Sequence, residues 1–135
     1  MKVLAAVFVA MFLMGCGSSE VVKKTLDMNT WEIVQIGAKS LEDMDSDQLP
    51  TMMFDLAKGQ ISGSTGCNSY SGSFSSDEFG VEMGEMAVTK KACPDMTTET
   101  MFLEALGNVA RIDLGDDMIR MFNASGVEVL EGRAK

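Results

Sequence analysis

The chain has 135 residues, of which 46% are hydrophobic and 23% are charged, so it is long enough for one globular domain and is not a disordered chain. Its 20 acidic and 11 basic residues give a formal net charge of −9, which argues against binding to DNA or RNA. The chain contains no histidine, which excludes Ser-His-Asp and Cys-His catalysis and histidine metal sites. Composition therefore predicts no cofactor and no nucleic-acid partner, and it names no activity.

The N-terminal residues have the pattern of an export signal. Lys2 precedes an unbroken apolar run over residues 3–13, which is too short to span about 30 Å of hydrocarbon as a helix. The run ends in Leu13-Met14-Gly15-Cys16, which resembles the lipobox of bacterial lipoproteins. This resemblance predicts a lipoprotein signal peptide over residues 1–15 and lipidation of Cys16. A plain signal peptide with a chance cysteine and an N-terminal core helix are the alternatives.

Lipidation would fix the location of the protein. Two or three acyl chains anchor a protein stably in a membrane, whereas one chain is marginal. Gly17 follows Cys16 at a position where an aspartate would resemble an inner-membrane retention signal. We therefore expect a protein of the bacterial cell envelope, at the outer membrane and facing the periplasm if the source is Gram-negative. Residues 16–28 would be the lipidated cysteine and a polar tether, and residues 29–132 the folded domain.

The rest of the sequence predicts short strands and one helix. Residues 97–106 are expected to be helical, because Phe102, Ala105, Leu106 and Val109 recur at the spacing i, i+3, i+4 and i+7. Turns are expected at Ser75-Ser76-Asp77 and at Gly84. Short strands at this spacing indicate an antiparallel barrel or sandwich. The expected strands cover residues 31–36, 52–56, 60–63, 70–74, 79–83, 86–89, 109–114, 119–122 and 127–130.

Several residue groups have a functional and a structural interpretation. Asp43, Asp45 and Asp47 alternate like the start of a calcium loop, but Gln48 stands where the loop needs glycine, so a solvated acidic loop is favoured. Asp116-Asp117 is interpreted as turn chemistry. The 13 methionines raise the question of copper, but most occupy apolar strand or helix positions and are expected to pack the core. We predict no metal site and no catalytic residue.

One segment is more specific. Residues 63–74 closely resemble the G-x-x-G-C-N-x-x-x-G-x-Y/F signature of the META domain family, to which the HslJ heat-shock protein belongs. Segments around Trp31, residues 89–94, the helix from Glu99 onward and residues 119–126 are similar to further family segments in the same order. Lys91 stands where the family usually has methionine. The resemblance covers residues 29–132, and its signature residues are Gly63, Gly66, Cys67, Asn68 and Gly72.

The resemblance implies a small α+β domain that is mostly β, with an antiparallel, barrel-like sheet of about eight strands and one helix packed across it. Members of the family are often envelope proteins or lipoproteins linked to heat shock, novobiocin resistance and envelope stress, and no enzymatic activity is established for them. We therefore expect a non-catalytic, lipid-anchored module in stress tolerance or envelope integrity, whose partner is an envelope protein or a small molecule. The alternatives are a barrel that holds a small apolar ligand and an enzyme with Cys67 as nucleophile.

The same segments contain the other two cysteines. Once Cys16 carries lipid, Cys67 and Cys93 remain, and export would place them in an oxidising compartment, which predicts a disulfide between them. Two buried free thiols or one reactive cysteine are the alternatives, because the Cα separation cannot be derived from the sequence. The signature glycines are expected to permit positive φ or close backbone approach, and Asn68 to bond backbone groups of a turn.

Overall fold

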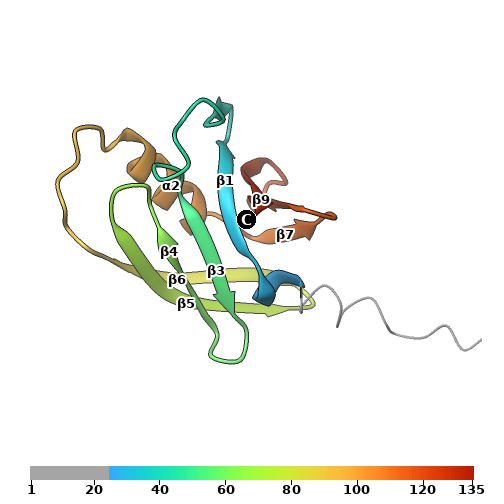
Figure 1. Ribbon diagram of the computed structural model, residues 1–135. Coiled ribbons are helices and arrows are strands. Elements are labelled where there is room, and N and C mark those ends of the chain that lie inside the picture. Colours follow the sequence, from blue (N-terminus) through green and yellow to red (C-terminus); the bar gives the residue numbers. More distant parts are fainter. Residues whose placement is uncertain (1–24) are drawn as a thin grey trace, which may run out of the picture.

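The computed structural model describes residues 25–135, which form a strongly curled antiparallel sheet with helix α2 (Thr97–Gly107) packed across it (Figure 1). The order of strands in the sheet is β6-β5-β4-β3-β1-β9-β8-β7, and the short β2 pairs with β1. Cys16 and the expected signal peptide lie outside the described residues. The strands are β1 (Thr30–Ile36), β2 (Lys39–Ser40), β3 (Thr51–Asp55), β4 (Gln60–Ser64), β5 (Ser69–Asp77), β6 (Gly80–Val88), β7 (Arg111–Leu114), β8 (Met118–Phe122) and β9 (Glu128–Ala134).

The sheet curls until its two outer strands approach each other. The N–H of Val81, near the start of β6, donates to the carbonyl oxygen of Ala110, just before β7, over 2.9 Å. Helix α2 contacts β6 on one side and β1 and β9 on the other. The expected fold, a barrel-like antiparallel sheet with one helix across it, is therefore confirmed.

The interior of the curled sheet is filled by its own side chains. Phe54 and Phe74 pack edge to face with ring centroids 5.0 Å apart, and Tyr70 and Phe102 do so at 5.4 Å. Small barrels are either filled by side chains or hold one ligand, so this packing favours a filled interior over a ligand-holding one. The fully buried side chains of this core include Trp31, Ile33, Met52, Ile61, Phe102, Leu106, Ile119 and Met121.

Helix α2 presents the predicted face to the core. Phe102 and Leu106 are both 0% exposed, whereas Glu104 faces solvent. Asp95 lies just before the helix, and its Oδ1 accepts the N–H of Thr97, the first residue of α2, over 2.8 Å. The periodicity of the apolar residues therefore predicted both the helix and its orientation correctly.

The middle hairpin differs from the expectation. Ser75-Ser76-Asp77 and Gly84 were both predicted as turns, and both predictions are wrong, because β5 and β6 continue through them. Gly84 lies instead at a shift of register between the two strands. The turn lies at Glu78 and Phe79, where Oδ1 of Asp77 accepts the N–H groups of Phe79 and Gly80 over 2.8 and 3.1 Å. Pairing between the two strands outweighs the local turn preference of serine and glycine.

The folded domain also extends beyond the expected bounds. Residues 25–28, expected to belong to the tether, are helical. Leu26 is buried in the core, and its carbonyl oxygen accepts the indole N–H of Trp31 over 3.3 Å. Oδ1 of Asp27 accepts the N–H of Leu56 in the β3–β4 turn over 2.9 Å. Four residues with two apolar side chains are too few to give a periodic signal, so this helical turn was not recognised from the sequence.

Candidate functional site: a disulfide-linked polar cluster

The signature residues lie in and beside the connection between β4 and β5, with Gly63 in β4 and Gly72 in β5. A tight turn forms there, in which the N–H of Thr65 donates to the carbonyl oxygen of Asn68 and the N–H of Asn68 donates to Oγ1 of Thr65, both over 2.8 Å. Gly66 has φ +90°, and a Cβ at this position would lie 2.3 Å from the carbonyl oxygen of Gln48. Only glycine therefore fits this position without displacing the backbone of the acidic loop.

The other two signature glycines lie where strands approach closely. A Cβ at Gly63 would lie 2.1 Å from the carbonyl oxygen of Thr51, and one at Gly72 would lie 2.8 Å from that of Glu85. Neither glycine has a positive φ. Gly63 and Gly72 therefore permit only the close approach of backbone, whereas Gly66 permits both a close approach and a positive φ.

Asn68 is the centre of a buried polar cluster. Its Nδ2 donates to Oε2 of Glu99 over 2.8 Å and to the carbonyl oxygen of Lys91 over 3.2 Å. Its Oδ1 accepts the N–H of Lys91 over 2.6 Å and the hydroxyl of Thr89 over 2.9 Å. The side chain thus uses both donors and both lone pairs, its full hydrogen-bonding capacity. It joins the signature turn, the segment after β6 and the first turn of α2.

Glu99 is the acidic member of this cluster. Its side chain is buried, and Oε2 also accepts the hydroxyl of Thr65, which is 0% exposed. Glu99 lies in the first turn of α2, where the helix dipole favours negative charge. The carboxylate is therefore held by two side-chain donors and by the end of the helix. This arrangement anchors the helix rather than presenting an acid to solvent.

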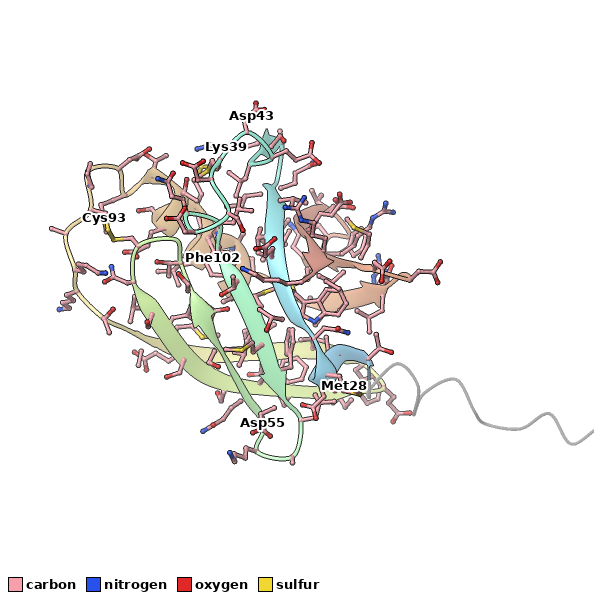
Figure 2. The ribbon with its side chains drawn as sticks, in the orientation of Figure 1. Met28, Lys39, Asp43, Asp55, Cys93 and Phe102 are labelled. Carbon is pink, nitrogen blue, oxygen red and sulfur yellow. A yellow bond between two sulfur atoms is a disulfide. The ribbon has the colours of Figure 1, made fainter. Side chains whose placement is uncertain are left out.

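A disulfide between Cys67 and Cys93 closes the cluster on its outer side (Figure 2). The Cα atoms are 6.1 Å apart, within the usual range for a disulfide. Sδ of Met96, the residue before α2, lies 3.7 Å from Sγ of Cys67. The bond ties the signature turn to the segment that leads into α2. With the bond intact, Cys67 has no thiolate to act as a nucleophile.

The acidic candidates do not converge on a site. Asp43, Asp45 and Asp47 lie exposed on the loop between β2 and β3. Among residues 25–135, no three cysteine, aspartate or glutamate side chains are placed to hold a metal ion. In the same part of the chain, no helix is sufficiently long and apolar to cross a membrane. The buried methionines belong to the core instead, with Met52 and Met121 fully buried.

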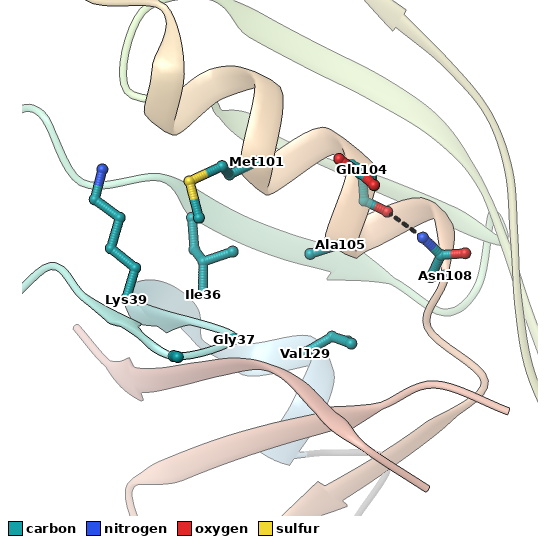
Figure 3. A pocket seen from close by; sticks show the side chains of 9 residues that line it. Ile36, Gly37, Lys39, Met101, Glu104, Ala105, Asn108 and Val129 are labelled. Atoms are coloured by element: carbon teal, nitrogen blue, oxygen red, sulfur yellow. Dashed lines mark hydrogen bonds between the residues drawn. The ribbon is translucent and has the colours of Figure 1, made fainter. Parts of the chain in front are cut away.

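A groove of about 540 Å³ lies outside the sheet, between α2 and the β1–β2 hairpin (Figure 3). Its floor is apolar and is formed by Ile36, Met101, Ala105 and Val129. Lys39 lies at one end and Glu104 with Asn108 at the other. The hairpin is held against the sheet because the N–H of Gly37 donates to the carbonyl oxygen of Val129 over 2.9 Å.

Sequence reasoning found only part of these sites. Gly63, Gly66, Cys67, Asn68 and Gly72 were identified together through the family signature, and the structure joins Cys67 to Cys93 and Asn68 to the nearby Lys91. The roles of Thr65, Thr89 and Glu99 were not recognised, because their contacts join segments that are far apart in the sequence. Glu99 gave one usable signal, since a glutamate in the first turn of a helix is favourable there. No pattern in the sequence pointed to the groove.

The comparisons with known proteins agree with this description. The META domain profile matches residues 24–135. An NMR structure of a protein from Burkholderia xenovorans has a TM-score of 0.66 at 16% identity, covering 98% of this chain and 99% of that one. A crystal structure of a DUF4847 family protein from Bacteroides vulgatus has a TM-score of 0.61 at 15% identity, covering 83% and 96%. At these identities the two structures support the fold alone. No curated protein sequence matches the chain.

Proposed function

The chain belongs to the META domain family, and we propose that it is a lipid-anchored, non-catalytic protein of the bacterial cell envelope that acts in stress tolerance or envelope integrity. Lipid at Cys16 holds it to the membrane, at the outer membrane and facing the periplasm. The domain formed by residues 25–135 acts by binding another molecule and not by transforming one.

The observation that carries this proposal is the disulfide between Cys67 and Cys93. Structural disulfides are typical of exported proteins and rare in the reducing cytosol. The bond therefore supports the export that the lipobox-like sequence at Leu13–Cys16 predicts. It also occupies the one thiol that had been considered as a nucleophile, which supports a protein without catalysis.

The signature residues support the same proposal. Asn68 uses its entire hydrogen-bonding capacity inside the protein, and Gly63, Gly66 and Gly72 lie where a side chain would collide with backbone. The signature thus maintains the turn between β4 and β5 and its hydrogen bonds to the segment after β6 and to the first turn of α2. A family signature with this role favours a shared scaffold whose function lies on its surface.

Metabolic labelling tests the anchor. Cells producing the wild-type chain, Cys16→Ser or Cys67→Ser are grown with an alkyne analogue of palmitate and separated into membrane and soluble fractions. We expect the wild type and Cys67→Ser to be labelled and to remain with membranes, and Cys16→Ser to lose both properties. Cys67→Ser is the matched control, because it removes a cysteine without changing the lipobox. Labelled, membrane-bound Cys16→Ser would show that the anchor is wrongly assigned.

A deletion strain of the source bacterium tests the stress role separately. We expect slower recovery after heat shock and greater sensitivity to novobiocin, both restored by the wild-type gene and restored poorly by Cys16→Ser. Growth of the deletion strain that equals the wild type under heat, novobiocin and detergent would contradict the stress role and would leave the labelling result unaffected.

A further inference from the structure

The groove between α2 and the β1–β2 hairpin is at the far end of β1 from the expected anchor. Met28 precedes β1 and Lys39 follows it, and Figure 2 shows the two residues at opposite ends of the strand. The chain between Cys16 and Thr25 has eight residues and reaches at most about 30 Å. An anchor at Cys16 therefore holds the Met28 end of the domain near the membrane. The groove lies at the end of β1 away from this attachment, so we expect it to be accessible to soluble or protruding proteins.

The shape of the groove favours a peptide over a small molecule. Small-molecule sites usually bury 70–90% of their ligand, whereas this groove is open along one side. Its floor combines the flexible Met101 with Ile36, Ala105 and Val129, and methionine adapts readily to the apolar side chains of different partners. A short extended segment can place one or two apolar side chains on this floor and keep its polar backbone in water.

Charge gives the groove a direction. The ammonium group of Lys39 forms no ion pair with any residue between 25 and 135, and the carboxylate of Glu104 makes neither an ion pair nor a hydrogen bond within that range. Hydrogen bonds from Thr97 lower the pKa of Asp95, and the nearby positive charge of Lys39 lowers it further. Asp95 partly offsets the charge of Lys39 but forms no ion pair with it, so opposite charges remain at the two ends of an apolar floor.

We propose that this groove binds a short extended segment of a partner protein, with one or two large apolar side chains on the floor, an acidic residue at Lys39 and a basic residue at Glu104. This inference deepens the proposed function. The side from which the partner approaches depends on the proposed anchor, whereas the chemistry that the partner must have depends only on the residues of the groove.

Selection of peptides tests the proposal without depending on the anchor. The full chain, purified from the producing cells in mild detergent, is immobilised and used to select from a displayed library of random heptapeptides. We expect enrichment of sequences in which an acidic residue, one or two large apolar residues and a basic residue follow in a fixed direction. Ala105→Arg, which places a charged chain on the floor, should abolish the enrichment.

Two charge variants make the test specific. Lys39→Glu should select peptides with basic residues at both ends and weaken binding of a wild-type-selected peptide about fivefold, the effect of one exposed ion pair. Lys90→Glu is the matched control, since Lys90 is exposed and lies outside the groove. It should select the wild-type pattern. Circular dichroism verifies that each variant is folded.

Several results would overturn the proposal. These are no enrichment above background, an unchanged charge pattern with Lys39→Glu, or equal loss of binding in Lys90→Glu. Sedimentation of the purified protein adds one more, because a dimer abolished by Ala105→Arg would make the groove an interface between copies of this chain. If the wild-type chain is not labelled with lipid but still selects the expected peptides, the anchor is refuted and the groove proposal stands. If the chain is labelled but selects no peptides, the groove proposal is refuted and the anchor stands.

Discussion

Nδ2 of Asn68 lies 2.8 Å from Oε2 of Glu99, so a side chain of the signature turn holds the first turn of a helix 31 residues further along the chain. The amide donates to the carboxylate while its oxygen accepts from Thr89 and Lys91. Aspartate, which is almost the same size, offers no donor for Glu99. The requirement for asparagine in this turn is therefore electrostatic as well as steric.

The first prediction follows from this pair. Asn68→Asp brings two carboxylates within hydrogen-bonding distance, where both cannot ionise without a large cost. We expect the free energy of unfolding at pH 7 to fall by roughly 2–3 kcal/mol. Urea unfolding of the variant and the wild type at pH 7 measures this.

Asn123→Asp is the matched control for this change. Oδ1 of Asn123 accepts the N–H groups of Ser125 and Val127 in the β8–β9 turn, and an aspartate oxygen accepts them equally well. We expect the stability of this variant to stay within about 0.5 kcal/mol of the wild type. Equal stability of the two variants at pH 7 would show that the hydrogen bond from Asn68 to Glu99 does not stabilise the fold.

Local patterns predicted part of this structure, and long-range contacts decided the rest. The face of α2 that carries Phe102 and Leu106 was predicted because its 3.6-residue period can be recognised within eight consecutive residues, 102–109. The turn in the middle hairpin was misplaced, because the pairing of β5 with β6 continues through Ser75 and Ser76 and outweighs their turn preference. The signature was recognised by resemblance, but the partners of Asn68 depend on how three distant segments meet.

The second prediction concerns the disulfide. We expect the denatured, unreduced mature protein to show no free thiol at Cys67 or Cys93 when it is alkylated and analysed by mass spectrometry. The loop that the bond closes has a sequence separation of 26, so chain entropy predicts that reduction lowers the free energy of unfolding by about 3–4 kcal/mol. A Cys67→Ser/Cys93→Ser double variant should be destabilised similarly and should not respond to reductant. Two alkylated thiols in the unreduced protein would refute the bond.

The third prediction tests the packing of α2. Phe102 is 0% exposed and contacts Tyr70 edge to face, so Phe102→Ala should lower the free energy of unfolding by about 3–5 kcal/mol. Glu104→Ala, two residues away on the solvent side, should change it by less than about 0.5 kcal/mol. Thermal and urea unfolding of both variants measure the difference. Similar effects at the two positions would mean that the helix is rotated relative to this description.

A buried carboxylate on the outer face of the sheet leads to the last prediction. Glu32 in β1 is 4% exposed, and its Oε1 accepts from Nζ of Lys135 and from the hydroxyl of Ser46, both over 2.9 Å. Oε2 lies 3.4 Å from Nη2 of Arg133 in β9. The hydrogen bond from Lys135, followed by those from Ser46 and Arg133, lowers the pKa of Glu32, although burial opposes the shift.

Because the pKa of Glu32 is lower in the folded protein than in the unfolded chain, its carboxylate adds stability at neutral pH, and this stability is lost as the pH falls through the folded-state pKa. Glu32→Gln should therefore be less stable than the wild type by about 1–3 kcal/mol at pH 7, and the difference should narrow progressively below about pH 4. Glu42→Gln, at an exposed position on the neighbouring loop, should change stability by less than about 0.5 kcal/mol. Urea unfolding of the three proteins from pH 7 to pH 3 measures both effects. A deficit of Glu32→Gln that stays constant over this range would show that the lost interaction is packing and not charge.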